Sequence, residues 1–182
     1  GIILMKKYLQ DLINKDSEFL DIINELITND TVLQMKNYLQ HYETTCYDHC
    51  LTVAYYCYLI CKKYHLDYRS AARAGMLHDL FLYNWRERQS DRKGFHAFTH
   101  GKTACENACK LFNLNDKEKD MIINHMWPVT LYLPKSIEGI ILTFVDKYSA
   151  MSETFEVMKS RLFMRKTFRY TYALLSLMII KF

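Results

Sequence analysis

Two adjacent residues, His78 and Asp79, are of types that could bind a metal ion together. A neutral imidazole beside a carboxylate suits a borderline divalent metal such as Zn, Fe, Mn or Ni. The pair follows Ala71, Ala74 and Gly75, whose small side chains would let a neighbouring helix come close. Because a His-Asp dipeptide also occurs by chance, a site here depends on ligands from elsewhere in the chain.

Four more residues of ligand type lie on or at the ends of other predicted helices: His49, His100, His125 and Asp146. Asp146 lies in a strongly apolar helix, where an aspartate is costly unless it is paired or bound to metal. His49 lies roughly 60° around its helix from Cys46, at the edge of the apolar stripe. The alternatives are a core histidine for His49, a solvent-exposed helix start for His100, and a helix-end histidine favoured by the macrodipole for His125.

The elements that must position these residues are predicted to be helices. Apolar residues recur at helical spacing, and 5 Gly and 2 Pro leave little room for tight turns, so we expect an all-α, single-domain helical bundle. The predicted helices cover 2–13, 19–27 (capped by Asp16 or Ser17), Asp30 or Thr31 through Leu39, about 46–64 (capped by Thr44 or Thr45), 69–82, His100 through Leu111, Asn115 or Asp116 to about His125, a helix from Pro134 or Ser136 past Asp146, and one or two more from Glu153.

Composition limits the class of protein. A length of 182 residues suits one domain, and a net charge of +4 is too mild to indicate nucleic acid, though it tolerates an anionic small substrate. No apolar run could span a bilayer and no signal peptide is evident. The six cysteines form three i, i+4 pairs without a Cys-x-x-Cys, which indicates buried thiols in a reducing cytoplasm.

The segment 83–99 breaks the helical pattern and is dense in charge. We interpret it as a loop that could bind substrate, with a solvated surface loop as the alternative. It contains Arg86, Arg88, Lys93 and His96. His96 competes with His100 as a ligand, since the two could share a helix face. We assign His100 as the ligand and His96 as a substrate-side group or a surface histidine.

The order His49, His78-Asp79, His100, His125, Asp146 resembles the HD superfamily, the all-α metal-dependent phosphohydrolases. The resemblance covers roughly 42–152, which leaves N-terminal helices at 2–40, with no expected chemistry, and a C-terminal helix or helices at 153–182. We expect the latter to pack with a solvated basic face rather than bind a membrane surface.

The resemblance implies that His49, His78, Asp79 and Asp146 hold a first metal. In the subset of the family with an extra His pair, Asp79 bridges to a second metal on His100 and His125. One or two transition metals are therefore expected, with His78 and Asp79 at the centre of the catalytic site.

One departure from the family pattern concerns the substrate. Many members carry a lysine three residues after the Asp, where it meets phosphate, but this chain has Leu82 there. The cations available to replace it are Arg86, Arg88, Lys93, Lys102 and Lys147. We expect a phosphohydrolase of a small phosphorylated metabolite, a nucleotide or phosphomonoester. A di-iron oxygenase of the inositol or phosphonate type and a non-catalytic metal-bound sensor are the alternatives.

Overall fold

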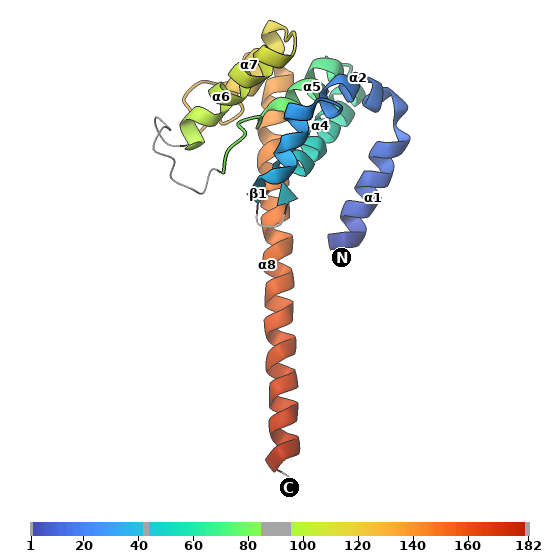
Figure 1. Cartoon of the computed structure of the whole chain (residues 1–182), viewed down its shortest axis with the longest axis vertical. Coiled ribbons are helices and arrows are strands. Elements are labelled where there is room, and N and C mark those ends of the chain that lie inside the picture. Colours follow the sequence, from blue (N-terminus) through green and yellow to red (C-terminus); the bar gives the residue numbers. More distant parts are fainter. Residues whose placement is uncertain (1, 42–43, 85–95, 181–182) are drawn as a thin grey trace.

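The computed structural model describes residues 2–41, 44–84 and 96–180, and within these ranges the chain is almost entirely helical (Figure 1). In this part of the chain the only strands, β1 (Leu39–His41) and β2 (Thr44–Thr45), form one short antiparallel pair. The predicted all-α fold is confirmed. The helices are α1 (Ile2–Lys15), α2 (Ser17–Ile27), α3 (Asp30–Leu33), the 3₁₀ turn η1 (Gln34–Asn37), α4 (Cys46–Lys63), α5 (Tyr68–Leu77), α6 (His96–Leu111), α7 (Asp116–Asn124) and α8 (Ile137–Ile180).

The helices α4 and α5 form the central pair, with α8 packed on α4 and α7 packed on α5. A Cβ built on Gly75 would lie 2.7 Å from the Cα of Ala54, so the two helix backbones touch at this glycine. Ala71 and Ala74 are fully buried in the same contact region of α5. The small residues therefore do allow close helix approach, as predicted.

Side-chain caps explain where several helices begin. Thr45 accepts a hydrogen bond from the backbone N–H of Asp48 at the start of α4, and Asp16 caps α2 in the same way. At α7, Asn115 and Glu118 form a reciprocal capping box. All three helix starts agree with the prediction, because each cap is a local interaction over three residues.

Two boundaries before the site differ from the prediction. The third helix ends at Leu33 rather than continuing through Leu39, because Leu39 pairs with Thr45 across the small sheet. The fifth helix ends at Leu77 rather than at Leu82. After Leu77 the chain turns through short-range backbone hydrogen bonds, and Leu82 takes a left-handed conformation with φ of 53°.

Two boundaries after the site also differ. Helix α6 already contains His96 and does not begin at His100. From Ile137 the chain forms one continuous helix of 44 residues, where separate helices before and after Glu153 were predicted. At 1.5 Å per residue, α8 is about 66 Å long, and Figure 1 shows it reaching far beyond the other helices.

The remaining predictions about the fold have different outcomes. Five of the six cysteines are buried thiols, and Cys109 on α6 is exposed. Among the described residues, no helix is long and apolar enough to cross a membrane. The basic side chains at 161, 165, 166 and 169 lie outside the described side chains, so their solvated face stays a prediction.

Candidate metal centre

Six residues of ligand type meet in the interior, and all are buried. They come from five places in the fold: the first turn of α4, the turn after α5, the second turn of α6, the end of α7 and the third turn of α8. The six are His49, His78, Asp79, His100, His125 and Asp146. Their ligand atoms form three overlapping groups, each within 4.8 Å, that could hold a metal ion.

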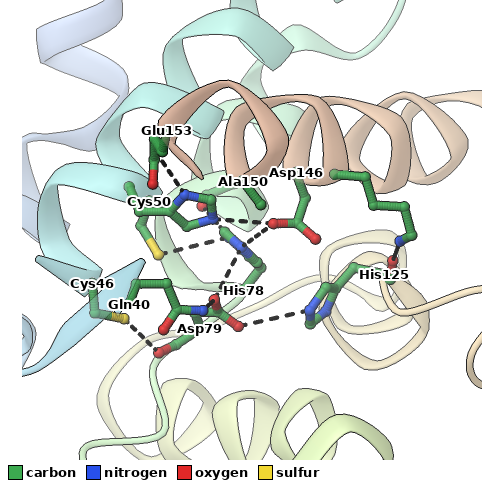
Figure 2. A network of polar contacts seen from close by, with 12 residues as sticks. Gln40, Cys46, Cys50, His78, Asp79, His125, Asp146, Ala150 and Glu153 are labelled. Carbon is green, nitrogen blue, oxygen red and sulfur yellow. Dashed lines mark hydrogen bonds and ion pairs between the residues drawn. The ribbon is translucent and has the colours of Figure 1, made fainter. Parts of the chain in front are cut away.

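One side of the cluster joins α4, the end of α5 and α8. The Nε2 atom of His49 lies 3.0 Å from Oδ1 of Asp146. The Nε2 atom of His78 lies 3.5 Å from the same oxygen and 3.5 Å from Oδ2 of Asp79. Two histidines and two carboxylates therefore face one another here, and Figure 2 shows Asp146 reaching down from α8 toward His78.

The other side joins Asp79 to α6 and the end of α7. Oδ1 of Asp79 lies 3.4 Å from Nε2 of His100 and 3.7 Å from Nε2 of His125. The two imidazole Nε2 atoms are 2.9 Å apart. Asp79 thus presents one oxygen to each side, which is the position of a bridging carboxylate.

Backbone carbonyls orient three of the four imidazoles. Each of these rings donates its Nδ1–H to a carbonyl: His78 to Gly75 at 2.8 Å, and His100 and His125 to residues 96 and 122 at 2.7 Å. Because a carbonyl accepts only, Nε2 of each neutral ring carries the lone pair and faces the site. This is the tautomer that binds metal, with the second nitrogen held by a hydrogen bond.

The arrangement fits a divalent cation. Burial, with His100 and His78 nearby, lowers the pKa of His125 to about 3, so its Nε2 is an acceptor at neutral pH. When both rings are neutral and donate from Nδ1, the Nε2 lone pairs of His125 and His100 face each other at 2.9 Å, a repulsion that a bound cation would relieve. Nε2 of His78 and Oδ1 of Asp79 are buried without a hydrogen-bond partner among the described residues. Such atoms are costly in a protein interior unless they bind an ion.

The carboxylates draw positive charge into the site. Burial opposes the charged form of His49, but hydrogen bonds to Asp146 and Glu153 raise its pKa well above the ordinary value. Burial likewise opposes ionisation of Asp146, yet His49 and His78 hold its pKa well below the usual range. Protons on histidines or a metal ion can supply this charge, so metal binding should release protons.

The sequence analysis did not identify several residues that support the ligands. Glu153 lies two helical turns after Asp146 and contacts Nδ1 of His49 at 3.1 Å, so the seven-residue spacing was a usable signal. Gln40, at the end of the segment 2–40 for which no chemistry was expected, donates from its amide to Oδ2 of Asp79. Cys46 donates its thiol to the carbonyl of Asp79 at 3.3 Å.

The predicted substrate-binding residues lie in different places. His96 stacks on His100, with ring centroids 4.4 Å apart, and its Nδ1 lies 2.9 Å from the Tyr83 hydroxyl. The Nζ of Lys147 donates to the carbonyl of His125 at 3.1 Å, and burial lowers its pKa.

Lys102 is exposed on α6 and pairs with Glu106 at 3.9 Å, so the structure does not bring it to the cluster. Arg86, Arg88 and Lys93 lie outside the described residues.

Comparison with protein families gives one match. The family model of the HD domain matches residues 46–151, which is more than half of the chain and includes all six candidate ligands. Comparisons with curated proteins and with solved structures found no match. The matched segment begins at the start of α4 and ends within α8, so it contains the helices that build the cluster. The chain therefore belongs to the HD domain family, the superfamily of metal-dependent phosphohydrolases.

Proposed function

We propose that the protein is a metal-dependent phosphohydrolase that acts on a small phosphorylated metabolite, a nucleotide or phosphomonoester. The observation that carries the proposal is Asp79, whose two oxygens face two sets of buried ligand atoms. His49, His78, Asp79 and Asp146 would hold one ion, and Asp79, His100 and His125 a second. A divalent metal bound there supplies Lewis acidity toward a phosphoryl oxygen and lowers the pKa of a bound water.

The protein's own groups would keep the ligands in place. Carbonyl hydrogen bonds hold three of the rings with Nε2 toward the site, and Glu153 does the same for His49 through Nδ1. Gln40 holds one oxygen of Asp79, so the carboxylate cannot rotate without breaking that bond. Rings and carboxylates that are already oriented lose little entropy when they bind an ion or a phosphate.

The contact with substrate phosphate must come from a group other than Leu82. We retain Arg86, Arg88 and Lys93 as the proposed anion contacts, since they follow the site directly in sequence. Lys102 is a weaker choice, because it is exposed and paired on α6. The amine of Lys147 is held by the carbonyl of His125, so it would have to leave that bond to reach a phosphate.

The test is a screen of nucleotides and phosphomonoesters with metal-loaded protein, comparing the parent chain with Asp79→Ala. Phosphate release that Asp79→Ala abolishes would support the proposal. Asp21→Ala is the matched control, because Asp21 is exposed on α2 and should leave turnover unchanged. If the metal-loaded protein releases no phosphate from any substrate, or if Asp79→Ala keeps full activity, the proposal fails.

A second candidate function is a di-iron oxygenase of the inositol or phosphonate type. The observation that favours it is the pair His100 and His125, which adds a second set of ligand atoms around Asp79. Protein purified without oxygen would then contain two irons per chain and consume O₂ with a polyol or phosphonate substrate. Zinc or manganese with phosphatase activity and no O₂ uptake would exclude it.

A further inference from the structure

A row of large apolar side chains follows one face of α8. The row alternates steps of four and three residues: Ile137, Ile141, Phe144, Tyr148, Met151, Phe155, Met158 and Leu162. This is the a/d pattern of a heptad repeat, in which one helix packs against another with the same repeat. The row ends after Leu162, because the next two positions of the pattern are Arg165 and Arg169. We call the eight residues the α8 seam.

The α8 seam is open to solvent in the described part of the chain. Ile141 is half-buried, and the other seven side chains are between 52% and 72% exposed. Large side chains of roughly 150–250 Å² each, more than half exposed, make an apolar surface on the order of 800 Å². The largest patch on an ordinary monomer is about 300–600 Å², whereas each partner of a stable complex buries about 800 Å². The seam is therefore large enough for a stable interface.

The opposite face of α8 belongs to the metal centre. Asp146 and Glu153 occupy the f position of the same heptad, which lies on the far side of the helix from a and d. Leu142, Val145 and Ser149, near these two residues on α8, are buried in the body of the domain. One helix thus carries Asp146 and Glu153 on one face and, among the described residues, an exposed apolar seam on the other, so a partner on the seam would not obstruct the site.

We propose that the α8 seam binds the α8 seam of a second copy of the chain, with the two helices antiparallel. The partner needs a helix with an exposed heptad row of about 38 Å, and α8 itself provides one. The charges at the C-terminal end of the seam favour antiparallel over parallel helices. Beyond Met158 the sequence has Lys159, Arg161, Arg165, Lys166 and Arg169 with no acidic residue, so parallel helices would place these like charges together. Antiparallel helices keep the two basic segments apart.

An antiparallel arrangement also matches the side chains. With the two-fold axis midway along the seam, Phe144 lies opposite Phe155 of the second copy, and Tyr148 lies opposite Met151. Ile137 lies opposite Leu162 in the same way. Each layer pairs an a position with a d position, as antiparallel coiled coils require. The same patch is used on both chains, so the interface closes as a two-fold dimer.

The first experiment measures mass in solution by light scattering and sedimentation. The parent chain should have twice the 21.8 kDa mass of one chain. Met151→Glu/Phe155→Glu should weaken dimerisation by at least about a hundredfold, because it buries unpaired charges. These side chains are exposed in one chain, so helicity by circular dichroism and metal content should not change. The matched control is Tyr64→Glu, which changes an exposed aromatic at the end of α4 and should stay dimeric.

The second experiment determines direction by oxidative cross-linking in a Cys109→Ser background, which removes the exposed thiol. A mixture of Phe144→Cys and Phe155→Cys chains should cross-link to each other, while neither variant should cross-link alone. Cross-linking of each variant with itself would show parallel helices and overturn the direction. A monomeric parent chain would overturn the proposal, as would a dimer that the double glutamate variant leaves intact or a monomer that binds anionic vesicles through the seam.

Discussion

At the scale of single residues, Asp79 is the point where the two halves of the metal centre meet. Its Oδ2 faces His78 and accepts a hydrogen bond from Gln40, and its Oδ1 faces His100 and His125. Loss of Asp79 would thus affect both halves, whereas loss of His49 or of His100 should affect only one. The histidines can therefore be used to ask how many metals bind.

We expect the double variant His100→Ala/His125→Ala to retain one metal on His49, His78, Asp79 and Asp146 and to lose most turnover. The reason is that His100 and His125 complete the second group with Asp79, whereas the four remaining ligands include the whole group of His49, His78 and Asp79. Elemental analysis per chain, with kcat/KM, measures both. Two retained metals would contradict the assignment, and one retained metal with full activity would make both histidines bystanders.

Glu153 should matter without touching the metal. Its carboxylate contacts Nδ1 of His49 at 3.1 Å and fixes the ring with Nε2 toward Asp146. Glu153→Gln should weaken metal affinity by about 10–100-fold, the usual cost of losing a carboxylate behind a metal-bound histidine. The measurement is titration with a competing chelator. Glu106→Gln, an exposed change on α6, should bind metal like the parent chain, and equal affinities for all three proteins would refute the role.

At the scale of elements, the site depends on how closely α4 and α5 pack. Their contact at Gly75 places the imidazoles of His49 and His78 with ring centroids 5.5 Å apart. Helix α5 then stops at Leu77, so that His78 and Asp79 can turn into the cluster. A change in the distance between the two helices should therefore affect stability and metal binding together.

Gly75→Ala tests that dependence. The added Cβ would lie 2.7 Å from the Ala54 Cα, and backbone cannot yield as a flexible side chain can. We expect a loss of about 1–3 kcal/mol in the free energy of unfolding, with weaker metal binding, although Gly→Ala in an unhindered helix usually stabilises. Urea denaturation measures the change. Arg69→Ala, an exposed change in the first turn of α5, should stay within about 0.5 kcal/mol of the parent. A neutral or stabilising Gly75→Ala would show that the helices are not in close contact.

At the scale of the whole molecule, a metal would join five parts of the chain that are otherwise held by packing. A metal that binds only the folded state stabilises that state by mass action. The gain is about 2.7 kcal/mol when the free metal concentration is a hundred times Kd. Removal by a chelator should thus lower Tm. This effect should depend on pH, because protons and metal compete for the same histidines.

The sign of that dependence follows from the raised pKa of His49 and His78. Burial opposes their charged forms, but neighbouring carboxylates raise the pKa of both rings above the ordinary value of 6.5. In the metal-free protein their stabilising contribution is complete below this value and is lost as pH rises through the folded-state pKa. Metal binds the neutral rings, so the difference in Tm between metal-bound and metal-free protein should widen from about pH 6.5 upward. Differential scanning calorimetry with and without metal measures it, and a constant difference up to about pH 8.5 would contradict the prediction.

The sequence by itself determined the helical class, most helix starts and the residue types of the candidate ligands. The caps at Asp16, Thr45 and Asn115 could be predicted because each satisfies backbone N–H groups within three residues of itself. The ligand types stood out because buried histidines and aspartates are costly without a partner. Local chemistry and the cost of burial can both be read along the chain.

Only the tertiary structure decided which of these residues meet. The contact between His49 and Glu153 spans 104 positions in the chain, and that between Gln40 and Asp79 spans 39. The tertiary structure also decided that α5 ends before His78. It placed Lys102 in solvent and Lys147 in a hydrogen bond to the carbonyl of His125. Periodicity describes which face of one helix is apolar, but not the distance or angle at which a second helix packs on it, and the site is built from those distances.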